Sequence, residues 1–259
     1  MSSADVANSR AAIARRRAMG RVTWPGLTLM LFARSIFSFL AQALVAGVYA
    51  LQSSPTPWLD AAGWFPVYAT LIDAGCLVAL WRLTRREGIA LLDLLSFDRS
   101  RWQRDVLLGL GLIPVSLVFI LAGVRGSSQL VFGTTEPPAL FHPLPLVPAL
   151  YAVLVFPAIW GLTEEMTYNG YLVPRFQILS RSTVVAVAAV SFAWSFQHVV
   201  QPLTFDPDFM LYRLLAPLPF SAFACLVYLR IRRLLPFVIA HWLMDAGDVL
   251  VTVLLPLYR

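Results

Sequence analysis

Two adjacent carboxylates, Glu164 and Glu165, interrupt the apolar stretch "PAIWGLTEEMTYNGYLVPRF". An ionisable side chain within a membrane-spanning segment costs on the order of 3 kcal/mol, so it is usually paired or functional. Two histidines, His198 and His241, also lie in apolar segments. A glutamate in low dielectric can take a proton from water, and imidazoles can orient that water or donate hydrogen bonds to a developing oxyanion. These residue types are competent to hydrolyse an amide within a membrane.

Helical spacing adds a polar neighbour to two of these residues. Asp245 follows His241 by four positions in "HWLMD", and Asn169 follows Glu165 by four in "EEMTYN". Residues four apart lie on one face of a helix. We therefore expect Asn169 to hydrogen-bond Glu165 and Asp245 to lie beside the imidazole.

Tryptophan residues lie four positions before two of these polar residues. Trp160 precedes Glu164 by four residues, and Trp194 precedes His198 by four. Each indole could separate its polar neighbour from lipid or water, although packing in the core would use the same positions.

The chemistry needs these groups at similar depth. Counting about 1.5 Å per residue from the nearest basic loop puts Glu164 about 16 Å, His198 about 25 Å and His241 about 12 Å into the membrane. All three distances fall within a hydrocarbon core of about 30 Å. We expect three helices to bring these side chains together, although a single membrane histidine can also serve only as a hydrogen bond between helices.

The composition indicates which kind of secondary structure positions these polar side chains. The 259 residues are 59% hydrophobic and 13% charged, with a mean hydropathy of +0.72, which is typical of polytopic membrane proteins. The sequence predicts an all-α bundle of about seven transmembrane helices, with the catalytic core in the last four. The predicted spans are 25–51, 61–81, 106–124, 146–173, 183–200, 209–229 and 234–256.

The chain divides into three parts by composition. Residues 1–24 form an Arg-rich tail, 25–145 hold the first spans, and 146–259 form the core. The apolar run after the tail is too long for a cleavable signal peptide and is expected to be an anchor. The connecting stretch "REGIALLDLLSFDRSRWQRD" alternates apolar and charged residues at helical spacing, which predicts a segment along the inner membrane surface.

The charge pattern predicts the topology. Basic residues cluster in alternate loops, at 10–21, 82–104, 175–181 and 230–233. By the positive-inside rule, the N-terminus is cytoplasmic and the C-terminus external. The net charge of +6 therefore reflects topology and contact with anionic lipid headgroups, and we expect no nucleic-acid partner.

The order of the motifs resembles that of the CPBP intramembrane proteases, which include the type II CAAX prenyl endopeptidases and bacteriocin-processing and self-immunity proteins. The family pattern is EExxxR, then FxxxH, then HxxxN or HxxxD, on successive helices. Here the motifs are "EEMTYN", "WSFQH" and "HWLMD", within about residues 146–250. Two positions depart from the pattern, because Asn169 replaces the arginine and Trp194 replaces the phenylalanine.

The resemblance implies roles for the motif residues. It assigns Glu164 and His198 to activating the attacking water, and His241 with Asp245 to the oxyanion. Because aspartate donates no hydrogen bond unless it is protonated, Asp245 could instead orient His241.

The missing arginine bears on the second glutamate. Glu165 lacks the cation that the family pattern supplies, and Asn169 can bond it without neutralising it. Glu165 is then either protonated or paired with an arginine from another span, such as Arg34 or Arg213.

The resemblance implies an intramembrane endopeptidase without a cofactor, in a bacterial cell membrane, that cleaves a membrane-embedded, prenylated or leader peptide. Two alternatives stay open. Glu164, His198 and His241 could ligate zinc in a metalloprotease, although no HExxH motif is present. The chain could also be a non-catalytic immunity or scaffold protein, for which the missing arginine is the best argument; transport is a more distant option.

Overall fold

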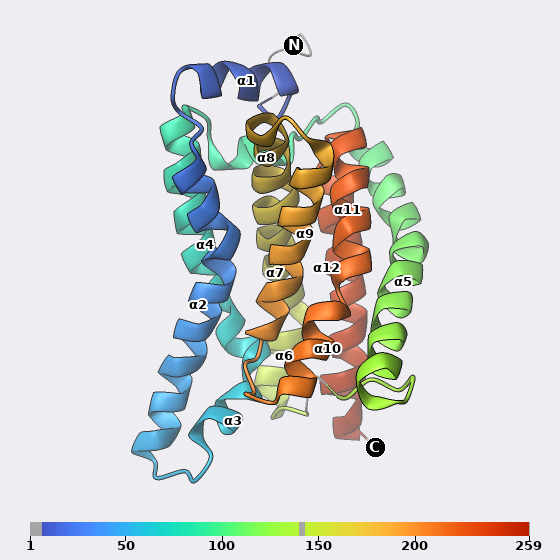
Figure 1. Cartoon of the computed structure of the whole chain (residues 1–259). Coiled ribbons are helices and arrows are strands. Elements are labelled where there is room, and N and C mark those ends of the chain that lie inside the picture. The colour runs from blue at the N-terminus through green and yellow to red at the C-terminus, as the bar shows by residue number, and fades with distance from the viewer. Residues whose placement is uncertain (1–6, 140–142, 259) are drawn as a thin grey trace.

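The computed structural model describes residues 7–139 and 143–258. Every regular element in these residues is a helix or helical turn, which confirms the all-α prediction (Figure 1). The N-terminal half contains α1 (Arg10–Ala18), α2 (Trp24–Leu51), α3 (Pro57–Ala62), α4 (Phe65–Glu87), the 3₁₀ turn η1 (Leu91–Leu95) and α5 (Trp102–Phe132).

The C-terminal half is more finely divided. It contains α6 (Leu146–Leu154), α7 (Phe156–Glu165), the π-helical segment η2 (Met166–Leu172), α8 (Val173–Ser180), α9 (Thr183–Val199), α10 (Pro207–Leu215), α11 (Leu218–Ile231), α12 (Leu235–Val249), the π-helical segment η3 (Leu250–Leu254) and the turn η4 (Leu255–Tyr258).

The helices form a polytopic bundle. Within residues 7–139 and 143–258, six helical stretches are long and apolar enough to cross a membrane, and the shorter apolar helix Thr183–Val199 lies among them in the bundle. The six stretches are Trp24–Leu51, Phe65–Glu87, Trp102–Phe132, Leu146–Ser180, Pro207–Ile231 and Leu235–Leu257. Together with α9, they agree with the seven predicted spans.

Successive spans run in opposite directions, so α1 and η4 lie at opposite ends of the bundle (Figure 1). Helix α1 packs at the same end as α8, where Arg17 Nη1 donates to the Ile178 carbonyl at 2.6 Å. One end of the bundle therefore gathers the arginine clusters of the tail and of the connections after α4, α8 and α11. The side of the membrane to which this end belongs stays a prediction.

Prolines explain most helix starts. A proline lies in the first turn of α2, α3, α4, α7, α8, α10, α11 and α12. Proline fixes φ and lacks the N–H that the first turn leaves unbonded, so it begins helices and interrupts them. The predicted span 209–229 is accordingly two helices, α10 and α11, which meet at Ala216 and Pro217.

The segment predicted to lie along the membrane surface is mostly not helical. Between α4 and α5 it forms only the turn η1, which ends where Ser96 adopts a left-handed conformation with φ 51°. Leu94 is fully buried. The connection is therefore fixed to the bundle by buried residues, among them Glu87, Leu94 and Asp105, and its place along the membrane surface stays a prediction.

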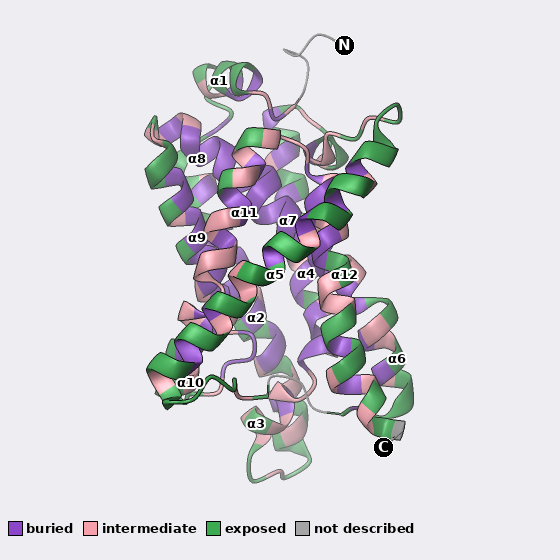
Figure 2. Ribbon diagram, turned by 90° about the vertical axis from the view of Figure 1, so that its right-hand side faces the viewer, coloured by how far each residue is buried: buried purple, intermediate pink, exposed green. Residues whose placement is uncertain are grey.

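Burial follows the membrane setting. Polar side chains are buried between the helices, whereas large apolar side chains such as Leu29, Leu44 and Val118 are exposed on the outside. Figure 2 shows this exposed surface along α5. An apolar exterior around a polar interior fits a protein surrounded by lipid.

Candidate active site

The glutamate pair ends α7, immediately before the π-helical segment η2. Such π-helical turns often occur at functional sites. Gly161, one turn before the pair, lets α12 approach closely. A Cβ atom at this position would lie 3.1 Å from the Trp242 backbone nitrogen and 3.4 Å from Cβ of His241. The absent side chain therefore brings His241 up to the glutamates.

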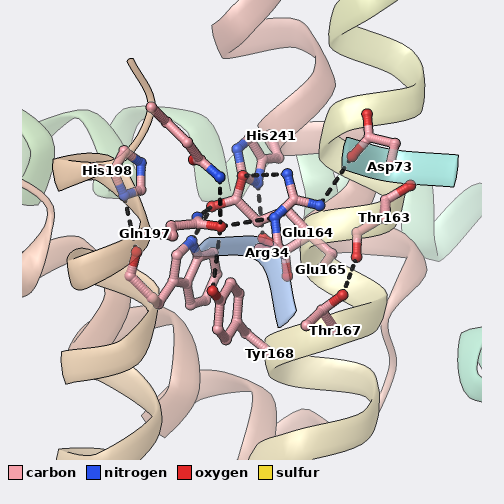
Figure 3. A network of polar contacts seen from close by, with 12 residues as sticks. Arg34, Asp73, Thr163, Glu164, Glu165, Thr167, Tyr168, Gln197, His198 and His241 are labelled. Carbon is pink, nitrogen blue, oxygen red and sulfur yellow. Dashed lines mark hydrogen bonds and ion pairs between the residues drawn. The ribbon is translucent and has the colours of Figure 1, made fainter. Parts of the chain in front are cut away.

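Glu164 is contacted by side chains from two other helices (Figure 3). Its Oε1 accepts hydrogen bonds from the Trp194 indole and the Gln197 amide, both on α9. Its Oε2 lies 3.8 Å from Nη2 of Arg34 on α2 and accepts no hydrogen bond from the described residues. The side chain is 1% exposed. One carboxylate oxygen is fixed by the protein, and the other keeps its capacity to accept a proton.

Arg34 places a cation beside Glu164. Its Nη1 pairs with Oδ1 of Asp73 on α4 at 2.9 Å, and its guanidinium lies 4.0 Å over the Trp160 ring. Trp160 was predicted to shield Glu164, and it instead covers the arginine beside that glutamate. The N-terminal helices α2 and α4 thus contribute charge to a site whose motifs all lie in the C-terminal half.

Gln197 connects this cation to the carboxylate. Its amide oxygen accepts from Nε of Arg34 at 2.7 Å and from the Tyr168 hydroxyl at 3.2 Å. Its amide nitrogen donates to Glu164. Because two donors hold the oxygen, the amide can only present its N–H to the glutamate.

Glu165 has different partners from those expected of an arginine-paired carboxylate. The predicted hydrogen bond from Asn169 is present, with Nδ2 2.7 Å from Oε2. The other oxygen, Oε1, lies 3.0 Å from Nδ1 of His241. Arg34 and Arg213, which the sequence offered as partners of Glu165, bond other groups instead. An imidazole stands where a guanidinium was expected.

His241 lies between two carboxyl groups. Nδ1 faces Glu165 at 3.0 Å, and Nε2 faces Oδ2 of Asp245 at 3.4 Å. A carboxylate only accepts hydrogen bonds, so the three groups must hold two protons between them to satisfy both contacts. Asp245 therefore has the geometry to orient the ring. In this arrangement neither imidazole nitrogen is left to donate to an oxyanion.

His198 has one nitrogen engaged. Nδ1 lies 2.9 Å from the Trp194 carbonyl oxygen, which can only accept, so Nδ1 carries a hydrogen. In the neutral ring, Nε2 then has a free lone pair, and in the described part of the chain it has no hydrogen-bond partner. No direct hydrogen bond joins His198 to Glu164 among those residues.

The four predicted catalytic residues nevertheless share one cavity of about 170 Å³. It is lined by Ile120, Val124, Glu164, Trp194, His198, Tyr212, Arg213, Ala216, Pro217, Phe220, His241, Met244 and Asp245. This volume exceeds what a single water molecule needs. The supporting residues Glu165, Asn169 and Trp160 lie behind this lining.

In the described residues, no group of three or more His, Cys, Asp or Glu side chains is arranged to hold a metal ion. The zinc alternative therefore stays a hypothesis for experiment. Gln197 contacts Glu164 but occupies an unspecified position of the second motif, so it was not predicted as a site residue. The signal was available, because this amide lies in an apolar helix directly before His198 and three residues after Trp194.

The comparisons with known proteins address the C-terminal half. The family model described as Rce1-like, type II CAAX prenyl endopeptidase, matches residues 145–247, which include all three motifs and nearly the whole cavity lining. No curated protein and no solved structure matches the chain. The match supports a protease, and over residues 145–247 it confirms the resemblance to the CPBP intramembrane proteases.

Proposed function

We propose that this protein is an intramembrane endopeptidase in which Glu164 activates a water molecule without a metal ion. The observation that carries the proposal is the state of the Glu164 carboxylate. Trp194 and Gln197 fix one oxygen, and the other oxygen accepts no hydrogen bond from the described residues. A positioned carboxylate with one free acceptor atom, beside a cavity that can hold water, suits a general base.

His198 assists from α9, where it lines the same cavity. With a hydrogen on Nδ1, its Nε2 can accept a hydrogen bond from the same water and orient it. Glu164 takes one proton as the water oxygen attacks the peptide carbonyl carbon, and the carbonyl oxygen becomes an oxyanion. When the carbon–nitrogen bond breaks, the Glu164 carboxyl group returns its proton to the leaving nitrogen. Atoms and charge balance, and the carboxylate is regenerated.

His241 acts on the electrostatics of this site. Its imidazole is held between Glu165 and Asp245, so it can carry positive charge close to the developing oxyanion. For a direct hydrogen bond to that oxygen, the longer contact, to Asp245, would have to open. Asp245 is then a group that orients His241 and releases its Nε2 to the substrate.

The substrate class follows from the surroundings. The cavity lies among helices that are long and apolar enough to cross a bilayer, so the peptide must reach it from the membrane. A prenylated or otherwise membrane-associated peptide has the apolar character that this route requires. The protein acts in the cell membrane, with α1 on the cytoplasmic side.

The test uses purified protein in detergent and a fluorogenic lipidated peptide. Glu164→Gln keeps the shape and removes the proton acceptor, so cleavage should fall about 100-fold or more with an unchanged melting temperature. Glu136→Gln, an exposed glutamate outside the site, is the matched control. Full activity in Glu164→Gln would remove the hydrolase mechanism.

A second arm addresses the metal. Activity should persist in phenanthroline, because the proposed water needs no Lewis acid. Inhibition that added zinc reverses would instead favour the metalloprotease with Glu164, His198 and His241 as ligands. A folded wild-type protein that cleaves no peptide from a lipidated library would favour the scaffold or immunity alternative.

A further inference from the structure

Arg213 lies in the wall of the same cavity, on α10. Its side chain is largely buried, with 9% of the residue exposed. Nε donates to the His198 carbonyl at 3.2 Å, and Nη2 donates to the Gln201 carbonyl at 2.9 Å. The guanidinium is therefore anchored where α9 ends, beside the histidine that faces the cavity.

The partners of Arg213 differ from those of other buried arginines. Arg34 pairs with Asp73 at 2.9 Å, and Arg175 pairs with Glu87 at 2.6 Å. In the described part of the chain, Arg213 forms no ion pair. A buried charge without a partner is unfavourable in a membrane. The carboxylates of Glu164 and Asp248 act on Arg213 only from beyond ion-pair distance, so an anion in the cavity can supply the direct partner.

The guanidinium also has donors to spare. It carries five N–H groups in a planar fork, and two of them bond the carbonyl oxygens of α9 and the following turn. Three N–H groups remain without an acceptor among the described residues. A planar fork of this kind matches a carboxylate or another paired oxygen group.

A structural role accounts for only part of this arrangement. An arginine at the carboxyl end of a helix satisfies terminal carbonyl groups and suits the helix dipole. That role uses the two bonded N–H groups, and it does not require the side chain to line a cavity with Glu164 and His198. The remaining donors are the part that needs a ligand.

The oxyanion formed at the scissile carbonyl needs a hydrogen-bond donor in the cavity. Both nitrogens of His241 face carboxyl groups, so the oxyanion has no fixed N–H partner from that side. We infer that Arg213 binds negative charge on the peptide in the cavity, either a carboxylate that the peptide brings or the oxyanion formed at the scissile carbonyl. This inference rests on the proposed hydrolase function.

The experiment separates the two sources with one pair of peptides. The substrates share a sequence and a lipid, and one ends in a free carboxylate while the other ends in a carboxamide. The variants are Arg213→Gln and Arg213→Lys. The matched control is Arg125→Gln, an exposed arginine on α5. Melting temperature in detergent is measured for each variant, and kcat and KM are measured with each peptide.

Each source has its own signature. If Arg213 binds a substrate carboxylate, Arg213→Gln raises KM at least tenfold for the free acid and leaves the carboxamide unchanged. If it binds the oxyanion, kcat falls at least tenfold for both peptides with KM unchanged. Arg213→Lys keeps the charge without the planar fork of N–H groups. It should therefore raise KM at least fivefold in the first case and lower kcat at least fivefold in the second.

Unchanged kcat and KM in Arg213→Gln with both peptides would overturn the inference. Should that variant fail to fold, Arg213→Lys decides alone, and unaltered kinetics in it have the same meaning. Either result leaves the proposed function standing, because that function depends on the Glu164→Gln measurement. Full activity of Glu164→Gln would contradict the proposed hydrolase function, whatever the Arg213 variants show.

Discussion

The indole of Trp194 donates a hydrogen bond to Oε1 of Glu164, from α9 to α7. The family pattern has phenylalanine at this position, which could pack in the same way without donating. Trp194 also stacks on Tyr168, with ring centroids 5.1 Å apart. The departure from the motif therefore adds a hydrogen bond to a buried carboxylate while keeping an aromatic ring in place.

This contact predicts the effect of Trp194→Phe. Phenylalanine keeps most of the stacking and removes the donor, and losing a hydrogen bond to a charged group costs about 1.5–3 kcal/mol. We expect the melting temperature to fall and kcat to drop about tenfold, since Glu164 is less well fixed. Trp102→Phe, at an exposed tryptophan, is the control. Unaltered stability and kcat in Trp194→Phe would show that the hydrogen bond contributes nothing.

Gln197 provides a separate test of positioning. Gln197→Met keeps the length of the side chain and removes both its bond from Arg34 and its bond to Glu164. We expect kcat to fall about 10–100-fold with KM little changed, because the residue orients Glu164 and does not touch the substrate. Gln197→Glu should be no better, since it places a second carboxylate beside Glu164.

The control for this series is Gln129→Met, on the exposed side of α5. A change in KM alone for Gln197→Met would indicate contact with the substrate and contradict a positioning role.

Ion pairs at the end of the bundle near α1 predict that loss of the Glu87 carboxylate strongly lowers stability. Glu87 is 1% exposed and pairs with Arg175 at 2.6 Å and with Arg16 of α1 at 2.9 Å. Glu87→Gln leaves two buried arginines without their carboxylate, which typically costs about 3–5 kcal/mol. We expect a lower melting temperature and faster proteolysis between α1 and α2. A variant as stable as wild type would show that other groups hold α1 on the bundle.

The topology can be checked with reporter fusions. Because the arginine clusters gather at the end of the bundle with α1, an N-terminal reporter should be active in the cytoplasm and a C-terminal reporter outside. Two reporters active on the same side would contradict the odd number of crossings. Both reporters switched to the opposite sides would keep the fold and reverse its orientation.

The sequence determined which segments are apolar enough to cross a membrane and which residues of three helices line one cavity. Apolar length is a local property, so α9 was predicted to within one residue. Spacing within a helix is also local, so the bond between Asn169 and Glu165 followed from four-residue periodicity. The interruption between α10 and α11 was missed, because an apolar run does not reveal where a chain turns.

Only the tertiary structure decided which groups meet across helices. The sequence offered Arg34 to Glu165, whereas packing of α2 against α4 and α9 brings it to Asp73 and Glu164. It likewise could not place His241 between two carboxyl groups, since that contact depends on how closely α12 approaches α7 at Gly161. Periodicity fixes the face on which a side chain lies, and the partner of that face depends on packing between segments far apart in the chain.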